Sequence, residues 1–302
     1  MQNRKVIPGI GFAILAAFIW SGNFIIARGV YKQIHPVSLA FYRWTIATIV
    51  IFPFAVKKFK NEWKLTKYSW RYLFCVSAMG ISLFNTVVYV AGHYTSAINL
   101  ALIGTTSSPI MSIILARIFL KEQIDIMKVI GLALCVCGIL FLLCRGNFQN
   151  LLAFHFSPGD LWMLLAAFCF AVYNILVRKK PAGISPVNFL FCIFLMGTIL
   201  LLPFFIWEQL SFTILWDRRL CVSFLYLGIG ASAICFSIWN ISIGILGAGR
   251  TALFGNLIPI FSMLGAIIFL KEEFSWIHVL SMVMVFGGLL MANLSQNIIS
   301  KF

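Results

Sequence analysis

Phe119-Leu120-Lys121-Glu122 returns unchanged as Phe269-Leu270-Lys271-Glu272, 150 residues further along the chain. The same spacing, with no gap, relates other pairs: Ile14-Leu15-Ala16-Ala17-Phe18 with Leu164-Leu165-Ala166-Ala167-Phe168, Pro36 with Pro186, Pro53 with Pro203, Pro109 with Pro259, Arg28 with Arg178, Gly80 with Gly230, and Gly138 with Gly288. The sequence therefore predicts two homologous halves, residues 1–150 and 151–302.

The composition is that of a membrane protein. Of the 302 residues, 62% are hydrophobic and 10% are charged, whereas a soluble domain is about half apolar and about a quarter charged. The first apolar run, Ile7 to Ala27, is too long for a signal peptide and lacks a cleavage site of small residues, so we expect it to remain as a span. Because a span needs about 20 apolar residues, we predict ten spans. They cover residues 7–27, 37–56, 70–92, 97–119, 127–144, 160–177, 187–207, 220–241, 249–270 and 276–294.

Each half holds five of these spans, and an odd number turns the second half upside down in the bilayer. We therefore expect an all-α integral membrane protein of ten transmembrane helices, built as two inverted five-helix repeats. Inverted repeats are common in secondary transporters, where two halves can rock around one central site. Since one chain carries both halves, a monomer is sufficient, and a dimer is compatible with the sequence.

The net charge of +15 is explained by orientation in the membrane. With the N-terminus in the cytoplasm, only six Lys and Arg residues lie outside, namely Arg28, Lys32, Arg145, Arg218, Arg219 and Lys271. Arg43 lies within a span, and the remaining sixteen of the 23 lie inside, which favours two cytoplasmic termini. We predict a multi-pass protein of the bacterial inner membrane. We expect no nucleic-acid partner, because no basic amphipathic domain is present.

The titratable residues suggest neither a cofactor nor a metal. The eight cysteines lie mostly within apolar spans, lack paired zinc-ligand spacing, and are best explained as packing residues. The acids all lie in loops or at span ends: Glu62, Glu122, Asp125, Asp160, Glu208, Asp217, Glu272 and Glu273. Because buried carboxylates usually relay protons in transporters, we expect facilitated diffusion or exchange without carboxylate-based proton coupling.

Several stretches resemble the EamA-type family of the drug/metabolite transporter superfamily. They are Trp20-Ser21-Gly22-Asn23-Phe24, Phe41-Tyr42-Arg43, Asn256-Leu257-Ile258-Pro259, the Phe-Leu-Lys-Glu copy at residues 269–272, and Gly287-Gly288. The resemblance covers essentially the whole chain. It implies a ten-helix bundle whose central cavity is lined by the first, third, fourth, sixth, eighth and ninth helices. It also implies export or exchange of small metabolites, with the aromatic-amino-acid exporter branch the most similar in detail.

Polar and aromatic residues of the first and third spans are the first candidates for the substrate cavity. Trp20 and Asn23 share one face of the first span. Asn85, Tyr89 and His93 recur every four residues and so form a ladder on one face of the third. The alternative is interhelical packing with these polar atoms bonded to backbone, and for His93 a position at the membrane interface.

The fourth and ninth spans match each other closely. Thr106 and Pro109 occupy the positions of Asn256 and Pro259. A proline three residues after a polar side chain leaves carbonyl groups that could bond substrate, or it simply bends the helix. Asn99 begins the fourth span as a cavity residue or as its N-cap.

The remaining candidates lie in the second, sixth and eighth spans. Tyr173 is the repeat mate of Asn23, and Asn174 follows it. Trp239 is the repeat mate of Tyr89 in the third span, and Asn240 lies beside it in sequence. Arg43 could attract a substrate carboxylate or snorkel to the interface. The family resemblance implies a structural or gating role for this residue.

The favoured function is a secondary transporter of small organic metabolites that exports or exchanges amino acids by alternating access. The alternative within this class is a larger substrate, such as a nucleotide derivative or S-adenosylmethionine, which would require more buried cationic or aromatic groups. An intramembrane enzyme is a remote alternative, because the acids are scattered rather than clustered. A receptor or scaffold would not need two inverted halves.

Overall fold

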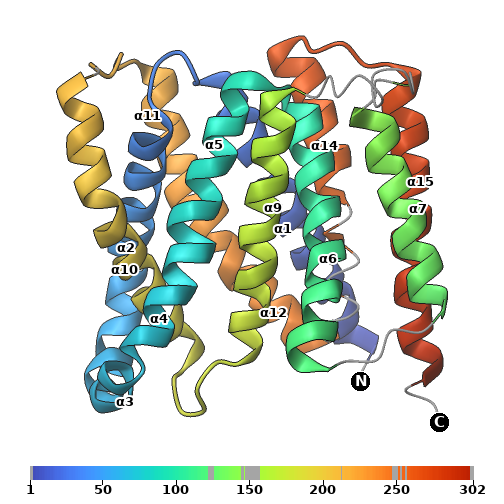
Figure 1. Ribbon diagram of the computed structural model, residues 1–302. Coiled ribbons are helices and arrows are strands. Elements are labelled where there is room, and N and C mark those ends of the chain that lie inside the picture. Colours follow the sequence, from blue (N-terminus) through green and yellow to red (C-terminus); the bar gives the residue numbers. More distant parts are fainter. Residues whose placement is uncertain are drawn as a thin grey trace.

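The computed structural model describes residues 3–121, 126–143, 146, 157–211, 213–246, 251, 254–255 and 257–299. This part of the chain forms a bundle of helices without strands (Figure 1). The helices are α1 (Asn3–Gly29), α2 (Pro36–Asn61), α3 (Trp63–Tyr68), α4 (Trp70–Ser77), η1 (Ala78–Leu83), α5 (Phe84–Tyr94), α6 (Ala97–Leu120), α7 (Ile126–Leu143), α9 (Pro158–Arg178), α10 (Pro186–Ser211), α11 (Arg218–Leu225), η2 (Tyr226–Ile234), α12 (Cys235–Leu246), α14 (Leu257–Gly265), η3 (Ala266–Leu270) and α15 (Trp276–Ile299).

Local sequence signals set several helix starts. Ser96, Ser157 and Asp217 precede α6, α9 and α11, and each side chain accepts a hydrogen bond from a backbone N–H of the first turn. Proline occupies the first turn of α2 and α9. A backbone N–H at that position would have no partner within the helix, so its absence from proline removes no hydrogen bond. The side chain of Asn99 is therefore not the N-cap of α6, since Ser96 fills that position.

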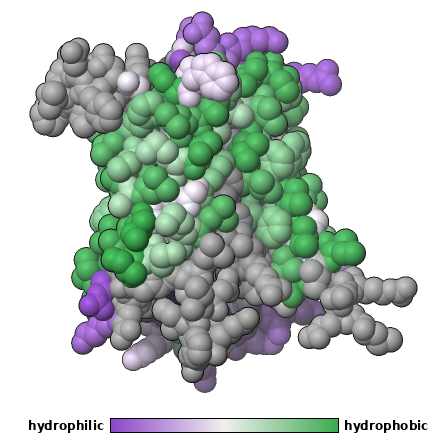
Figure 2. Space-filling model, turned by 90° about the vertical axis from the view of Figure 1, so that its right-hand side faces the viewer, coloured by the Kyte–Doolittle hydropathy of each residue, from purple (hydrophilic) through white to green (hydrophobic). Residues whose placement is uncertain are grey.

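Apolar length identifies the membrane-spanning helices. Among the residues that the structure describes, seven helices are long and apolar enough to cross a bilayer: Ile7–Gly29, Pro36–Asn61, Trp70–Tyr94, Ala97–Phe119, Pro158–Arg178, Pro186–Ser211 and Arg218–Trp239. Shorter apolar helices cover Val129–Leu142, Leu257–Leu270 and Trp276–Gly288. The count of ten spans stays a prediction, and part of the expected span 249–270 lies outside the described residues. Figure 2 shows apolar side chains over the middle of one face and hydrophilic side chains at its ends, as a membrane protein requires.

The two halves contact each other through equivalent residues at two places. Thr48 Oγ1 lies 3.4 Å from Thr198 Oγ1, and Cys135 Sγ lies 3.4 Å from the carbonyl oxygen of Val285. Each contact joins residues that are 150 apart in sequence. In Figure 1, α1 and α9 run in opposite directions, and both chain termini lie at the same end of the bundle. We call this the termini end, and the other the opposite end.

The repeat extends to an unusual helical geometry. The π-helical segments η1 and η2 interrupt the third helix of each half, and Ala78–Leu83 shifted by 150 residues falls inside Tyr226–Ile234. Such π segments are uncommon and occur frequently at functional sites. Lys121 and Lys271, also 150 apart, both end their helices in the left-handed region with φ of 57°. The halves also differ, because η3 is π-helical where the matching end of α6 is α-helical.

Candidate functional site

Arg43 lies at the centre of a buried polar cluster, which we call the Arg43 cluster. Its Nη1 donates to Asn23 Oδ1 at 2.6 Å, to Asn85 Oδ1 at 2.8 Å and to the hydroxyl of Tyr89 at 2.9 Å. Its Nε donates to Ser232 Oγ at 3.0 Å. The Arg43 side chain is 4% exposed, so the guanidinium is held inside the protein rather than snorkelling to the interface.

Four helical elements from both halves build this cluster. Asn23 comes from α1, Arg43 from α2, Asn85 and Tyr89 from α5, and Ser232 from η2. Asn85 and Tyr89 are one helical turn apart, so both reach the same guanidinium. Asn85 also donates from Nδ2 to the carbonyl oxygens of Gly80 and Ile81, at 3.4 and 3.2 Å, within η1. The π segment thus fixes the amide that faces the arginine.

The positive charge of Arg43 has no acidic partner in the described part of the chain. All four of its hydrogen-bond acceptors are neutral oxygens. Arg43 lies about 10 Å from the start of α2, at 1.5 Å of rise per residue. An arginine at the centre of a membrane helix costs about 2.5–3.5 kcal/mol, and such residues commonly mark substrate or ion pathways.

Two aromatic side chains from different halves meet beside the cluster. The ring centroids of Trp20 in α1 and Trp239 in α12 lie 5.0 Å apart. Trp20 also donates from Nε1 to the carbonyl oxygen of Ala231, which directly precedes Ser232. Both indoles are partly exposed, so they offer apolar walls next to a polar centre.

Other predicted cavity residues lie away from the cluster. The ring of His93 packs edge-on against Tyr31 near the opposite end, and its carbonyl oxygen accepts from Arg28. Asn99 donates to Thr95 Oγ1 at 3.4 Å, while its buried Oδ1 has no partner among the described residues. Thr106 donates to the carbonyl oxygen of Leu102 within its own helix.

The other candidates from the second half lie in different environments from one another. Tyr173 is 8% exposed and stacks on Phe170, and Asn174 donates to Ser112 Oγ at 3.3 Å, which joins α9 to α6. The side chain of Asn240 and the whole of Asn256 lie outside the described residues. Pro109 lies within the unbroken α6, whereas Pro259 lies in the first turn of α14, where proline leaves no hydrogen bond unmade. Their roles, like those of the other site candidates, stay predictions.

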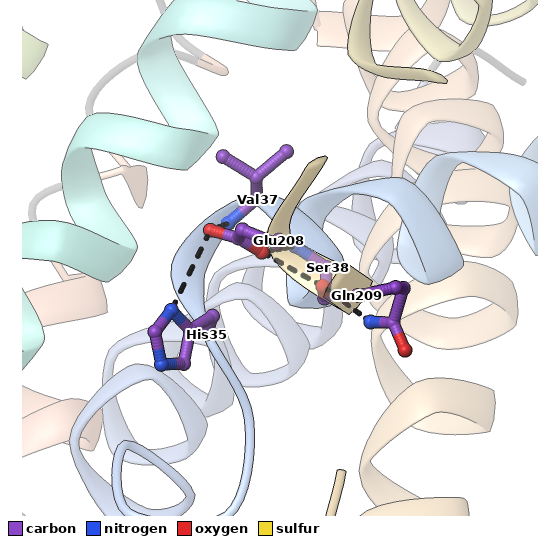
Figure 3. A network of polar contacts seen from close by, with 5 residues as sticks. All are labelled: His35, Val37, Ser38, Glu208 and Gln209. Carbon is purple, nitrogen blue, oxygen red and sulfur yellow. Dashed lines mark hydrogen bonds and ion pairs between the residues drawn. The ribbon is translucent and has the colours of Figure 1, made fainter. Parts of the chain in front are cut away.

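Three glutamates cap helices of the opposite half. Glu208, near the end of α10, accepts from the backbone N–H groups of Val37 and Ser38 at 3.1 and 2.7 Å, at the start of α2 (Figure 3). Its Oε1 also lies 4.0 Å from His35 Nδ1. Conversely Glu62, which follows α2, accepts from Ser185 N at 2.9 Å and from Asn188 Nδ2 at 2.6 Å, at the start of α10. The pair α2 and α10 is therefore capped reciprocally at its two ends.

Glu272 belongs to the repeated Phe-Leu-Lys-Glu stretch and makes the third such cap. It accepts from the backbone N–H groups of Ala97 and Ile98 at 2.7 and 3.2 Å. A carboxylate at a helix N-terminus is favoured by the helix dipole and by the unpaired N–H groups. The Glu272 side chain thus joins the end of η3 to the start of α6 in the other half. Its repeat mate Glu122 lies outside the described residues.

Sequence reasoning missed Ser232 and the partners of the three capping glutamates. Ser232 carries no local signal, because a serine in an apolar span is usually a packing residue. The repeat offered a partial signal for Glu272, since the same tetrapeptide ends two matching helices. The structure shows that Glu272 caps the start of α6, a helix of the other half.

The sequence profile of the EamA-like transporter family matches residues 7–144 and again 157–294. The chain therefore belongs to the EamA-like transporter family, within the drug/metabolite transporter superfamily, as the motifs of the first and second spans predicted.

Relatives in other organisms agree with this assignment. An uncharacterized transporter of Archaeoglobus fulgidus is 23% identical over 287 residues, covering 94% of this chain and 96% of that protein. The uncharacterized transporter YyaM of Bacillus subtilis is 26% identical over 84% of this chain and 82% of its own. The S-adenosylmethionine uptake transporter of Rickettsia conorii is 26% identical over 66% of this chain and 65% of its own. A solved crystal structure, 17% identical, shares the fold with a TM-score of 0.64 over 97% of this chain and 98% of that one.

Proposed function

We propose that this transporter moves amino acids across the bacterial inner membrane, by export or exchange, through alternating access of its two halves. The Arg43 cluster carries this proposal, because helices of both halves supply its polar atoms. A transport site that lies between two inverted repeats can be reached from either side when the halves rock. A single chain contains both halves and is sufficient as the transporting unit.

The chemistry of the interior favours a small zwitterion. Amide, phenol and hydroxyl groups surround a single guanidinium, and the indoles of Trp20 and Trp239 stand beside them. The six acids that the structure describes, Glu62, Asp160, Glu208, Asp217, Glu272 and Glu273, all lie at helix ends or in loops. We therefore propose transport without a carboxylate proton relay, and we propose no catalysis.

S-adenosylmethionine is the second candidate substrate. The observation that favours it is the name of the Rickettsia relatives, S-adenosylmethionine uptake transporters, of which the protein from Rickettsia felis is 25% identical over 66% of this chain. S-adenosylmethionine is itself an amino acid with a large cationic side chain. The two candidates thus share an α-ammonium and an α-carboxylate and differ in the room that the side chain needs.

Counterflow into proteoliposomes tests the proposal. Vesicles are loaded with unlabelled amino acids and diluted into a trace of labelled amino acids, and a parallel set uses S-adenosylmethionine. Uptake above that of protein-free vesicles, without a change in internal pH, is the expected result. Absence of uptake for both substrates would contradict the function, and acidification coupled to uptake would contradict the mechanism. Thiol labelling of an added terminal cysteine in intact cells tests the cytoplasmic position of the termini.

A further inference from the structure

We propose that Arg43 is the residue that binds the carboxylate of the transported molecule, through an N–H group of its Nη2 atom; this proposal rests on the transport function above. The Arg43 guanidinium has five N–H groups, and the described contacts use only those of Nε and Nη1. Within the described part of the chain, Nη2 donates no hydrogen bond. The residue is nevertheless 96% buried, as its 4% exposure shows.

The neutral acceptors fix the direction in which this free edge points. A guanidinium is planar, so bonds from Nε and Nη1 to four side chains on three other helices determine where Nη2 lies. Its conformational freedom is lost before any substrate arrives. A carboxylate is an anionic acceptor that suits the N–H donors of a cation, and such charge-assisted hydrogen bonds are stronger than neutral ones.

The chemistry of the cluster leaves the charge available for a ligand. Asn23 and Asn85 each present an amide oxygen where an aspartate of the same shape would present a carboxylate. An acid at either position would form a permanent ion pair with Arg43 and cancel its attraction for an anion. With amides there, the buried cation is oriented but not neutralised, and burial without neutralisation makes an incoming anion favourable.

The two halves differ at this place in a way that limits the substrate to one bound carboxylate. The repeat mates of Arg43, Asn23 and Asn85 are Ile193, Tyr173 and Cys235. These three side chains are buried and uncharged. The site is thus single rather than duplicated, which predicts preference for monocarboxylates over dicarboxylates of similar size.

The test compares an amino acid with its own α-amide, which keeps the ammonium and the side chain but lacks the carboxylate. The probe is the amino acid that gives the largest counterflow, and S-adenosylmethionine forms a separate arm. Binding is followed in parallel by the ligand-induced rise in melting temperature of the purified protein. We expect the amide to compete at least about tenfold more weakly than the acid in the unaltered protein, and less than about threefold more weakly in Arg43→Gln.

Two further variants keep the result interpretable if Arg43→Gln folds poorly. Asn23→Asp preserves the shape and the acceptor oxygen but adds a permanent anion beside Arg43, so it should stay folded and lose the preference for the carboxylate. Arg71→Gln makes the same substitution at an exposed arginine and should keep the preference.

The outcomes separate the two proposals. Stabilisation by acids that depends on Arg43, but without uptake, would support the carboxylate site and overturn the transport function. A second outcome is uptake in which the amide competes as well as the acid, either in the unaltered protein or equally in all variants. This outcome would overturn the carboxylate site and leave the transport function standing. Neither uptake nor Arg43-dependent stabilisation would overturn both.

Discussion

Thr48 and Thr198 are 150 residues apart in sequence and touch each other, hydroxyl to hydroxyl, at 3.4 Å where α2 crosses α10. Each hydroxyl also lies within hydrogen-bonding distance of a carbonyl oxygen four residues earlier in its own helix, Trp44 for Thr48 and Phe194 for Thr198. If a two-fold axis relates the halves, a residue that touches its own repeat mate lies close to that axis. The internal repeat is therefore visible in one pair of touching side chains.

This contact predicts a specific cross-link. In a Thr48→Cys, Thr198→Cys variant, mild oxidation should form a disulfide between the two helices, because the native side chains already touch. Mass spectrometry of the digested protein identifies the linked peptides. The control pairs Thr198→Cys with Ile49→Cys, whose native side chain is 65% exposed and turned outward. A linked peptide in the control but not in the test variant would contradict the packing of α2 on α10.

The cap made by Glu208 should stabilise the fold measurably. Glu208→Gln removes the charge that faces two backbone N–H groups at the start of α2. We expect a loss of about 1 kcal/mol in unfolding free energy, since charged caps contribute roughly that much. Thermal unfolding in detergent measures the change. Glu273→Gln is the matched control, because Glu273 is exposed, and it should shift the melting temperature little.

Glu62 predicts a pH dependence of stability in the acid range. Burial raises the pKa of its carboxyl, but hydrogen bonds from Asn188 and Ser185, with the nearby Lys58 ammonium, outweigh it and hold the pKa below the ordinary value. A depressed folded-state pKa means that the stabilisation is fully present above the ordinary carboxyl pKa of about 4.3 and is lost as the pH falls through the folded pKa. The melting temperature should therefore fall between about pH 5 and pH 3.

The Glu62→Gln variant isolates this contribution. It should melt at a lower temperature than the unaltered protein at pH 7, and the difference should shrink as the pH falls. An unchanged difference across this range would show that ionised Glu62 does not stabilise the cap.

Asn85 should be the most sensitive amide of the Arg43 cluster. Asn85→Ala removes an acceptor from the guanidinium and also the donor that serves the carbonyls of Gly80 and Ile81. Buried polar groups left without partners cost about 1–3 kcal/mol, so we expect a loss of about 2 kcal/mol in detergent unfolding. Ser237→Ala is the control, because that exposed hydroxyl bonds only to its own helix. Equal losses in the two variants would argue against a buried network at Asn85.

Much of the architecture could be predicted from local patterns. Apolar runs of about 20 residues indicate helices, and the repeat at 150 residues pairs them into halves. The four-residue spacing of Asn85 and Tyr89 indicated a shared face, and both contact Arg43. His93 continues that spacing yet packs against Tyr31, because the end of α5 lies beside the end of α1 rather than beside α2. Periodicity reveals a face, but not the neighbour that the face meets.

The class of the protein can be assigned from the linear chain, since apolar spans, a repeat without gaps and short motifs are all properties of that chain. Which atoms meet depends on how the helices pack. Ser232 reaches Arg43 across 189 residues, and Glu208 reaches the start of α2 across 170 or more. Such bonds depend on how helices cross, to within fractions of an ångström, and no spacing along the chain encodes that geometry. The buried cation without an acid beside it becomes apparent only when the helices are assembled.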